Sequence, residues 1–129
     1  MFLGLRTIIY PAPDLAASKA WFIALLGIDP YFDEPFYVGF NVAGYELALD
    51  PAADPSRGPL TYWGVADASD ALTWLLEAGA APHGAVREVG DGIQVASVVE
   101  PGGSILAVIA NPHFVLPAAP PVTDAAHGR

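Results

Sequence analysis

The sequence has no cysteine, few basic residues and no long apolar run. The absence of Cys from its 129 residues excludes disulfides, thiolate metal sites and thiol nucleophiles. Only five Lys and Arg stand against fourteen Asp and Glu, giving a formal net charge of −9, so binding to nucleic acid or to an anionic membrane surface is not expected. The charge would attract a cationic ligand, or it keeps an apolar-rich chain in solution.

The apolar content is high for a chain without a membrane span. Hydrophobic residues make up 53% of the sequence and the mean hydropathy is +0.42. The longest apolar run, residues 20–28, is far shorter than the roughly 20 residues that cross a bilayer. We therefore expect the apolar residues to line a core, a pocket or a subunit interface. Pro11 and Pro13 interrupt the stretch that follows Arg6, so no secretory signal is expected and the protein is placed in the cytoplasm.

Thirteen Pro and thirteen Gly divide the chain into short elements. In the first half, the pattern predicts a helix at about 15–26 that begins after Asp14 as N-cap and ends at Gly27. Alternation and turn residues predict the strands of this half. Their ranges are 5–10, 30–33, 36–42 and 45–49.

The same order of elements begins again after a Pro-rich linker at 50–59. A strand at 60–65 precedes a helix that begins at Asp67 or Asp70 and ends at Gly79. Strands are then expected at 84–89, 93–99 and 104–110. Residues 1–115 should form a single domain, and the Pro- and Ala-rich residues 116–129 a flexible tail.

The two halves also match residue by residue, which indicates an internal duplication. A shift of 53 aligns an aromatic residue, a helix cap and a helix Trp in each half, and a shift of 59 aligns the two last strands. The aligned residues are Tyr10 with Trp63, Asp14 with Asp67, Trp21 with Trp74, Gly44 with Gly103, Leu47 with Leu106, Ala48 with Ala107 and Leu49 with Val108. The sequence therefore predicts an α+β fold of two tandem βαβββ modules, at about 3–50 and 60–113.

Three segments resemble the vicinal oxygen chelate superfamily, which includes glyoxalases, bleomycin-resistance proteins and extradiol dioxygenases. These are LTYWGVADASDAL at 60–72, VVEPGGSILAVI at 98–109, which is similar to the family's Asp-Pro-Asp-Gly-Asn turn and last strand, and the early helix with Asp14, Phe22 and Gly27. The resemblance implies that the two modules form an open eight-stranded cup with the helices outside.

The resemblance also implies one divalent ion, held by the first and last strand of each module. The corresponding positions in this chain are Thr7, Ala48, Leu60 and Ala107. Only the neutral hydroxyl of Thr7 offers a donor atom, whereas hard and borderline cations require several carboxylates or imidazoles. The sequence therefore predicts no metal and no other cofactor. The histidines do not replace these ligands, because His83, His113 and His127 share no metal-ligand spacing and are interpreted as surface or turn residues.

Strand alternation predicts which side chains line the cup and which face the helices. If Thr7 and Leu60 face the cup, so do Ile9, Tyr62 and Gly64, while Trp21 and Trp74 pack as core residues against the opposite face. The full predicted lining is Thr7, Ile9, Phe32, Phe36, Phe40, Glu46, Ala48, Leu60, Tyr62, Gln94 and Ala107.

Glu46 is the one carboxylate expected near this cup. It lies two residues before Ala48 and so points to the same strand face. It could serve as a ligand-facing anion, as a general base with a pKa raised by desolvation, or as a solvated carboxylate at the edge of the strand.

These features favour a metal-free small-molecule binding protein. It would sequester an apolar, aromatic or cationic compound, as the bleomycin-resistance branch does, and form a homodimer through apolar surfaces. The alternative is an enzyme of the superfamily, of the lyase, isomerase or dioxygenase type, whose activity depends on the metal. A third possibility is a metal-free enzyme that uses Glu46 as its base.

Overall fold

The computed structural model describes residues 2–115. It shows the same order of elements twice, with a short 3-10 turn in the linker. The elements are β1 (Gly4–Pro11), α1 (Leu15–Leu26), β2 (Phe32–Glu34), β3 (Tyr37–Val42), β4 (Tyr45–Asp50), the 3-10 turn (Pro55–Arg57), β5 (Leu60–Gly64), α2 (Ala68–Glu77), β6 (Ala81–Glu88), β7 (Gln94–Val99) and β8 (Ile105–Ala110). The doubled β-α-β-β-β order is confirmed. β6 begins three residues earlier than predicted, so His83 lies inside this strand. The predicted tail, 116–129, falls outside the described residues.

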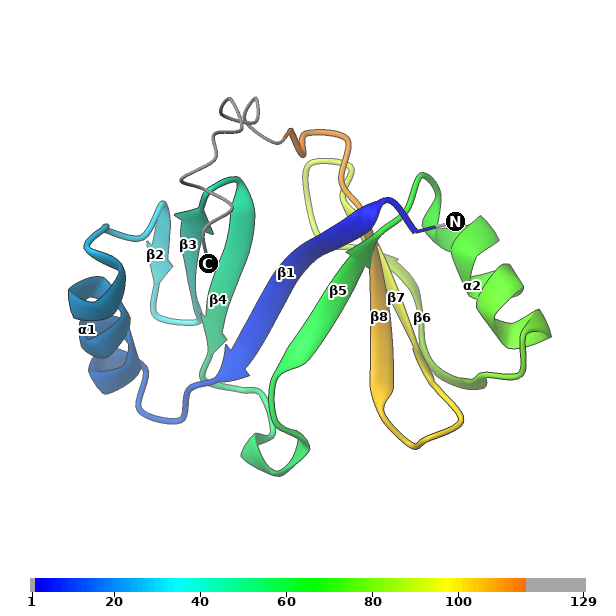
Figure 1. The fold of residues 1–129 in the computed structure, drawn as a ribbon, viewed down its shortest axis with the longest axis horizontal. Helices are drawn as coiled ribbons and strands as arrows, with labels where there is room; N and C mark the ends of the chain where they lie inside the picture. Colours follow the sequence, from blue (N-terminus) through cyan, green and yellow to red (C-terminus); the bar gives the residue numbers. More distant parts are fainter. Residues whose placement is uncertain (1, 116–129) are drawn as a thin grey trace, which may run out of the picture.

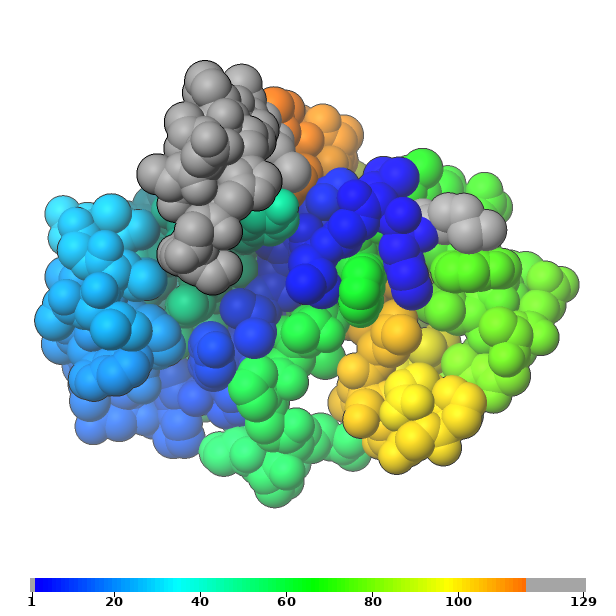
Figure 2. All heavy atoms as spheres, in the orientation of Figure 1, coloured from blue at the N-terminus to red at the C-terminus, as the bar shows by residue number. Residues whose placement is uncertain are grey.

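All the strands belong to one open, mixed sheet of eight strands in the order β2-β3-β4-β1-β5-β8-β7-β6. Within each module the first strand pairs in parallel with the last, and the modules meet where β1 pairs antiparallel with β5. Figure 1 shows α1 and α2 at opposite ends of the sheet, each beside the strands of its own module. In Figure 2, the side chains of β1 and β5 remain visible between these two helix-covered ends.

Both helices begin at an aspartate that caps their free backbone N–H groups. Asp14 accepts a hydrogen bond from the N–H of Ala17 at 3.1 Å, and Asp67 accepts one from the N–H of Asp70 at 2.8 Å. Side chains of this type satisfy donors that the first turn of a helix leaves unpaired. Asp67, and not Asp70, is therefore the N-cap of α2.

Two apolar clusters lie between the sheet and the helices, one in each module. Under α1, Phe40 is fully buried beside Val38 and Leu49, with its ring centroid 6.4 Å from that of Phe22. The prediction that Phe40 lines the cup is therefore wrong. Side chains alternate along β3, so Val38 and Phe40 face the helix while Tyr37 lies on the other face.

The same alternation in β7 moves Gln94 away from the cup. Ala96 and Val98 pack in the cluster under α2, and Gln94 has their parity. Val95, of the opposite parity, lies on the cup face. The predicted place of Gln94 in the cup wall is wrong because an odd step along a strand reverses the face.

The two helix tryptophans differ in their surroundings, although the repeat aligns them. Trp74 is half-buried and packs on the cluster under α2, edge-on to Phe2 at 5.3 Å between ring centroids. Trp21 is 60% exposed, so the prediction that it is a core residue is wrong. The inner face of α1 is made by Phe22 and its helical neighbours, and Trp21 lies about 100° around the helix from Phe22.

No helix within residues 2–115 is long and apolar enough to span a membrane.

Candidate ligand-binding site

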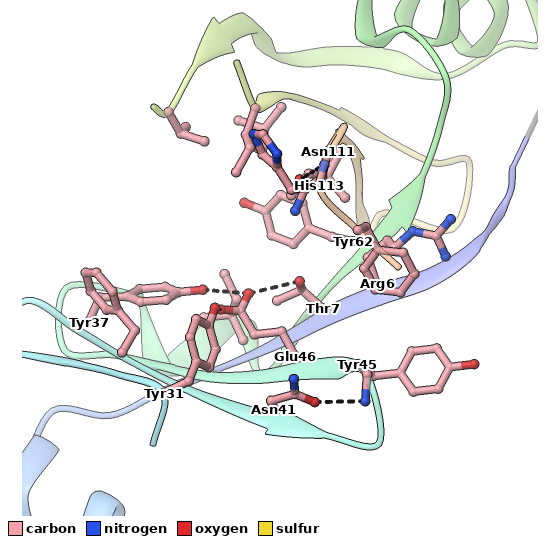
Figure 3. Close-up of a pocket in the computed structure, with 18 of the residues that line it drawn as sticks. Arg6, Thr7, Tyr31, Tyr37, Asn41, Tyr45, Glu46, Tyr62, Asn111 and His113 are labelled. Atoms are coloured by element: carbon pink, nitrogen blue, oxygen red, sulfur yellow. Dashed lines mark hydrogen bonds between the residues drawn. The ribbon is translucent and has the colours of Figure 1, made fainter. Parts of the chain in front are cut away.

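The cup face of the sheet contains a cavity of about 760 Å³ lined by residues of both modules. This volume lies within the range of pockets that enclose small organic molecules. Its aromatic lining comes from β2 and the loops on either side of it, from the first residues of β3 and β4, from β5 and from the segment after β8. These residues are Tyr31, Phe32, Phe36, Tyr37, Tyr45, Tyr62 and Phe114. The pocket is drawn in Figure 3.

Glu46 lies in the cavity wall and accepts hydrogen bonds from three hydroxyl groups. Its Oε1 accepts from Thr7 Oγ1 at 3.0 Å and from the Tyr37 hydroxyl at 3.1 Å, and its Oε2 accepts from the Tyr31 hydroxyl. The parallel register of β1 and β4 places Thr7 directly beside Glu46. Glu46 is half-buried, so the structure places it inside the cup and not at a solvated strand edge. Figure 3 shows the hydroxyls converging on this carboxylate.

The tyrosines of this cluster remain protonated at neutral pH. Burial raises the pKa of Tyr31 and of Tyr37 well above the ordinary value of 10.0, and the adjacent Glu46 raises both further through its charge and its hydrogen bonds. A carboxylate has about four acceptor positions, of which three are occupied here. The remaining position belongs to Oε2, so Glu46 can accept one further donor from a ligand.

Gly39 makes room for this cluster. A Cβ atom at residue 39 would lie 2.8 Å from Oε2 of Glu46 and 2.9 Å from Cε1 of Tyr31, closer than such atoms approach in proteins. The Gly39 carbonyl also accepts a hydrogen bond from the N–H of Tyr31 at 2.9 Å. A larger residue at this position would displace the carboxylate or the phenol.

Basic side chains also line the cavity. Arg6 lines it from β1, Arg87 from β6 and His113 from the segment after β8. The guanidinium carbon of Arg6 lies 3.9 Å from the centroid of the Phe114 ring, a cation–π contact. The Nε2–H of His113 donates to the Asp91 carbonyl at 2.9 Å. In Figure 3, Tyr62 lies between His113 and the Glu46 cluster.

The structure brings together some of the predicted residues but not all. Thr7, Ile9, Phe32, Phe36, Glu46 and Tyr62 line the cavity, whereas Phe40 and Gln94 do not. Ala48, Leu60 and Ala107 lie on the cup face by register, but Ala48 and Ala107 are fully buried and none of the three lines the cavity. That the lining residues contact a ligand stays a prediction.

Sequence reasoning missed Arg6, Tyr31, Tyr37, Asp50, Arg87 and the cavity position of His113, so Glu46 is not the one carboxylate in the cavity wall. For β3 a signal was present. Apolar Val38, Phe40 and Val42 alternate with Tyr37, Gly39 and Asn41, which assigns the first set to the core and Tyr37 to the cup. No comparable signal marks Tyr31, because it precedes β2 in a loop.

The residues at the ligand positions implied by the resemblance do not fit a divalent cation. Thr7 donates its hydroxyl proton to Glu46, and Ala48, Leu60 and Ala107 carry no donor atom for a metal. Within residues 2–115, no group of three or more His, Cys, Asp or Glu side chains could hold a metal ion. A hard or borderline cation needs such a set.

No protein-family model and no curated protein matches this sequence. Solved structures do match. A hypothetical protein of Bacillus halodurans C-125 has a TM-score of 0.71 at 13% identity, over 88% of this chain and 97% of that chain. A methylmalonyl-CoA epimerase variant of Streptomyces coelicolor, in complex with 2-nitronate-propionyl-CoA, has a TM-score of 0.68 at 16% identity, over 87% and 99%. A glyoxalase/bleomycin resistance protein/dioxygenase superfamily member of Vibrio splendidus 12B01 has a TM-score of 0.65 at 19% identity, over 82% and 97%.

This chain and these structures share an α+β fold, which in this chain is built on an open eight-stranded sheet. The cavity of this chain lies on the cup face of that sheet. The arrangement is the vicinal oxygen chelate fold, as the resemblance in the sequence implies. At such identities the likeness concerns the fold, since one fold serves many functions.

Proposed function

We propose that this protein binds a small organic molecule with a cationic group and an apolar or aromatic body, and that it does so without a metal ion. The single observation that carries the proposal is the Glu46 carboxylate, held by three hydroxyls in the wall of an aromatic-lined cavity. The carboxylate is the natural partner of the ligand's cation.

The aromatic rings around Glu46 support this ligand class. Tyr31 and Tyr37 donate to Glu46, and the rings of Phe32 and Phe36 lie edge to face with centroids 6.0 Å apart in the same wall. Aromatic faces attract organic cations, and such rings also bury an apolar body. Because the hydroxyls already fix the carboxylate, a ligand would bind with little loss of side-chain freedom.

Titration of the purified protein with dansylcadaverine and with basic aromatic antibiotics, by calorimetry or dansyl fluorescence, tests the proposal. Replacing Glu46 by Gln should weaken binding of the cations about 10- to 100-fold, because a charge-assisted hydrogen bond contributes about 1.5–3 kcal/mol. Glu77→Gln, which makes the same charge change at the exposed end of α2, is the matched control and should bind normally. Absence of binding to every cation would contradict the proposal.

The unused acceptor position of Glu46 supports a second candidate, a metal-free enzyme. A carboxylate in a cavity can remove a proton from a carbon next to a carbonyl group. Exchange of that proton for deuterium in a bound carbonyl compound, followed by NMR, would detect such activity. Exchange that is unchanged in Glu46→Gln would eliminate Glu46 as the base. Activity that appears only after addition of Ni, Zn, Mn or Fe would instead favour the metal-dependent lyases, isomerases or dioxygenases.

The proposal includes a homodimer that forms through the outer face of α1. Trp21 and Leu25 are 60% and 61% exposed on α1, and Ile28, just after the end of the helix, is 38% exposed. At a net charge of −9 two copies repel one another, so contact is favoured at an apolar face such as this one. Light scattering should show a dimer that Trp21→Ser dissociates, and a monomeric wild type would exclude it.

A further inference from the structure

We infer that the ligand is amphoteric, with a carboxylate in addition to its cationic group, and that Arg87 and Arg6 bind this carboxylate. The inference rests on the proposed function and adds a second charged contact in the same cavity. It follows from the position of the basic residues, from their lack of acidic partners and from their separation from Glu46.

Basic residues are scarce in this chain but gather at the cavity. The Lys and Arg residues within 2–115 are Arg6, Lys19, Arg57 and Arg87. Arg6 and Arg87 both line the cavity, in a chain whose net charge is −9. Two guanidinium groups in the cavity would weaken the binding of a ligand that carries only a positive charge, because like charges repel one another.

Neither arginine is neutralised by an acid of the described chain. Among residues 2–115 the one ion pair joins Lys19 to Asp33, at 2.8 Å. Arg6 donates one hydrogen bond, to the Leu5 carbonyl at 3.2 Å, and a guanidinium has five donors. Its remaining N–H groups and those of Arg87 are therefore available to a carboxylate, which a guanidinium binds in a matching planar geometry.

The Arg6 guanidinium is held in place before any ligand arrives. Phe114 stacks on it, with 3.9 Å between the guanidinium carbon and the ring centroid. Gly64 lies beneath it, and a Cβ atom at residue 64 would come within 2.5 Å of Nε. A positioned guanidinium loses less conformational freedom on binding than one in open solvent.

Glu46 and Arg87 come from different modules, and Tyr62 of β5 lies near both. Tyr62 is close enough to both for their charges to act on it: burial is the main cause of its raised pKa, Arg87 opposes the rise, and Asp50 and Glu46 add to it. Figure 3 shows His113 on the far side of Tyr62 from Glu46, and the Arg6 guanidinium directed away from Glu46. Opposite charges that line one cavity without pairing can both be satisfied by a ligand that carries the complementary charges at its two ends.

Three dansyl compounds that differ only in their charged groups test the inference. Nα-Dansyl-lysine carries an ammonium and a carboxylate joined by a butyl chain, dansylcadaverine lacks the carboxylate, and Nα-dansyl-norleucine lacks the ammonium. Fluorescence titration of the wild type should show Nα-dansyl-lysine binding about 2- to 5-fold more tightly than dansylcadaverine, which is modest because Arg87 is exposed. Nα-Dansyl-norleucine should bind more weakly than Nα-dansyl-lysine.

Arg87→Gln should remove the preference for Nα-dansyl-lysine and, because it also removes a charge that repels cations, should raise the affinity for dansylcadaverine. Arg57→Gln, which removes the same charge in the linker turn, is the matched control and should keep the preference. Glu46→Gln should weaken both ammonium compounds but not Nα-dansyl-norleucine. Melting curves confirm that each variant is folded, and the wild-type comparison stands without any variant.

The outcomes separate this inference from the proposed function. If the wild type binds dansylcadaverine as tightly as Nα-dansyl-lysine, the carboxylate contact is excluded while cation binding stands. If Arg87→Gln weakens both ammonium compounds equally, Arg87 has a structural role and the inference is wrong. If none of the three compounds binds, both the inference and the proposed function are contradicted.

Discussion

The two modules repeat the same elements but present different chemistry to the cup. The first places the hydrogen-bonded Glu46 there, whereas the repeat aligns Ile105 of the second module with Glu46. The second module supplies Arg87 and His113 instead. The duplication therefore preserves the order of strands and a core under each helix, whereas the side chains that the two modules place on the cup face differ. A single cavity can thereby carry opposite charges.

The largest expected effect concerns the core of the first module. Phe40 is fully buried under α1, so Phe40→Ala should lower the free energy of unfolding by about 3–5 kcal/mol. Phe36→Ala, at a ring that is 64% exposed, should change it by less than about 1 kcal/mol. Urea denaturation measures both. Equal losses would mean that Phe40 does not hold the first module together.

The helix tryptophans provide the next test. Trp74→Ala removes a half-buried ring that packs on Phe2 and should cost about 2 kcal/mol. Trp21→Ala removes an exposed ring and should cost less than about 1 kcal/mol in the monomer. Chemical denaturation at low protein concentration compares them without a contribution from self-association. A loss of stability in Trp21→Ala as large as that in Trp74→Ala would show that Trp21 also packs as a core residue, as the repeat predicts.

Two glycines in strands, Gly39 in the first module and Gly64 in the second, should respond differently to substitution by alanine. Gly39→Ala should cost about 1–3 kcal/mol and weaken dansylcadaverine binding, because the new methyl group overlaps Glu46 and the Tyr31 ring. Gly64→Ala should cost less, since the new methyl group meets only the guanidinium of Arg6, which one hydrogen bond and the Phe114 ring hold and which can shift away. Urea denaturation measures the stability of the two variants, and fluorescence titration measures their affinity for dansylcadaverine. Unchanged cation binding in Gly39→Ala would show that the position of Glu46 does not matter.

The tyrosines of the cavity make the folded state sensitive to alkali. The pKa values of Tyr31, Tyr37 and Tyr62 are raised above 10.0 by burial, so the folded protein holds these protons more tightly than the unfolded chain. Their contribution to stability is present below pH 10.0 and is lost as the pH rises through the range between the unfolded and folded pKa values. Denaturation at a series of alkaline pH values should show the decline, and Tyr37→Phe should make it shallower. An equally steep decline in that variant would point to groups elsewhere.

The smallest expected effect is that of divalent metals. Because neither module provides a ligand set at the positions of Thr7, Ala48, Leu60 and Ala107, addition of Zn, Ni, Mn or Fe(II) should leave the melting temperature unchanged. A chelator should have no effect either. A saturable rise in the melting temperature would show that a metal site exists.

The sequence predicts the fold well but the cavity only in part. Pro, Gly and the capping aspartates mark the ends of the elements, and the repeat fixes their order, because these signals are local. The parity of β3 and β7 is harder to predict, since one residue of error exchanges the two faces of a strand. The predicted cup-facing positions of Phe40 and Gln94 are wrong for this reason.

The Glu46 cluster depends on contacts that no local pattern contains. Tyr31 reaches Glu46 from a loop, and Thr7 does so through the pairing of β1 with β4, 39 residues apart in the chain. Arg87 and His113 come to the cavity only when the second module closes on the first. Such long-range meetings follow from the complete topology of the sheet.

The pairing of β1 with β5 has a consequence for the size of the ligand. Among residues 2–115 it is the one strand pairing that joins the two halves of the sheet, and Thr7, beside Glu46, lies opposite Tyr62. A slip of two residues in this register would slide one wall past the other by about 7 Å, with every side chain still on its own face. This register therefore sets how far Arg87 of the second module lies from Glu46 of the first, and so limits the separation of the charged groups that a bound molecule can present to these two residues.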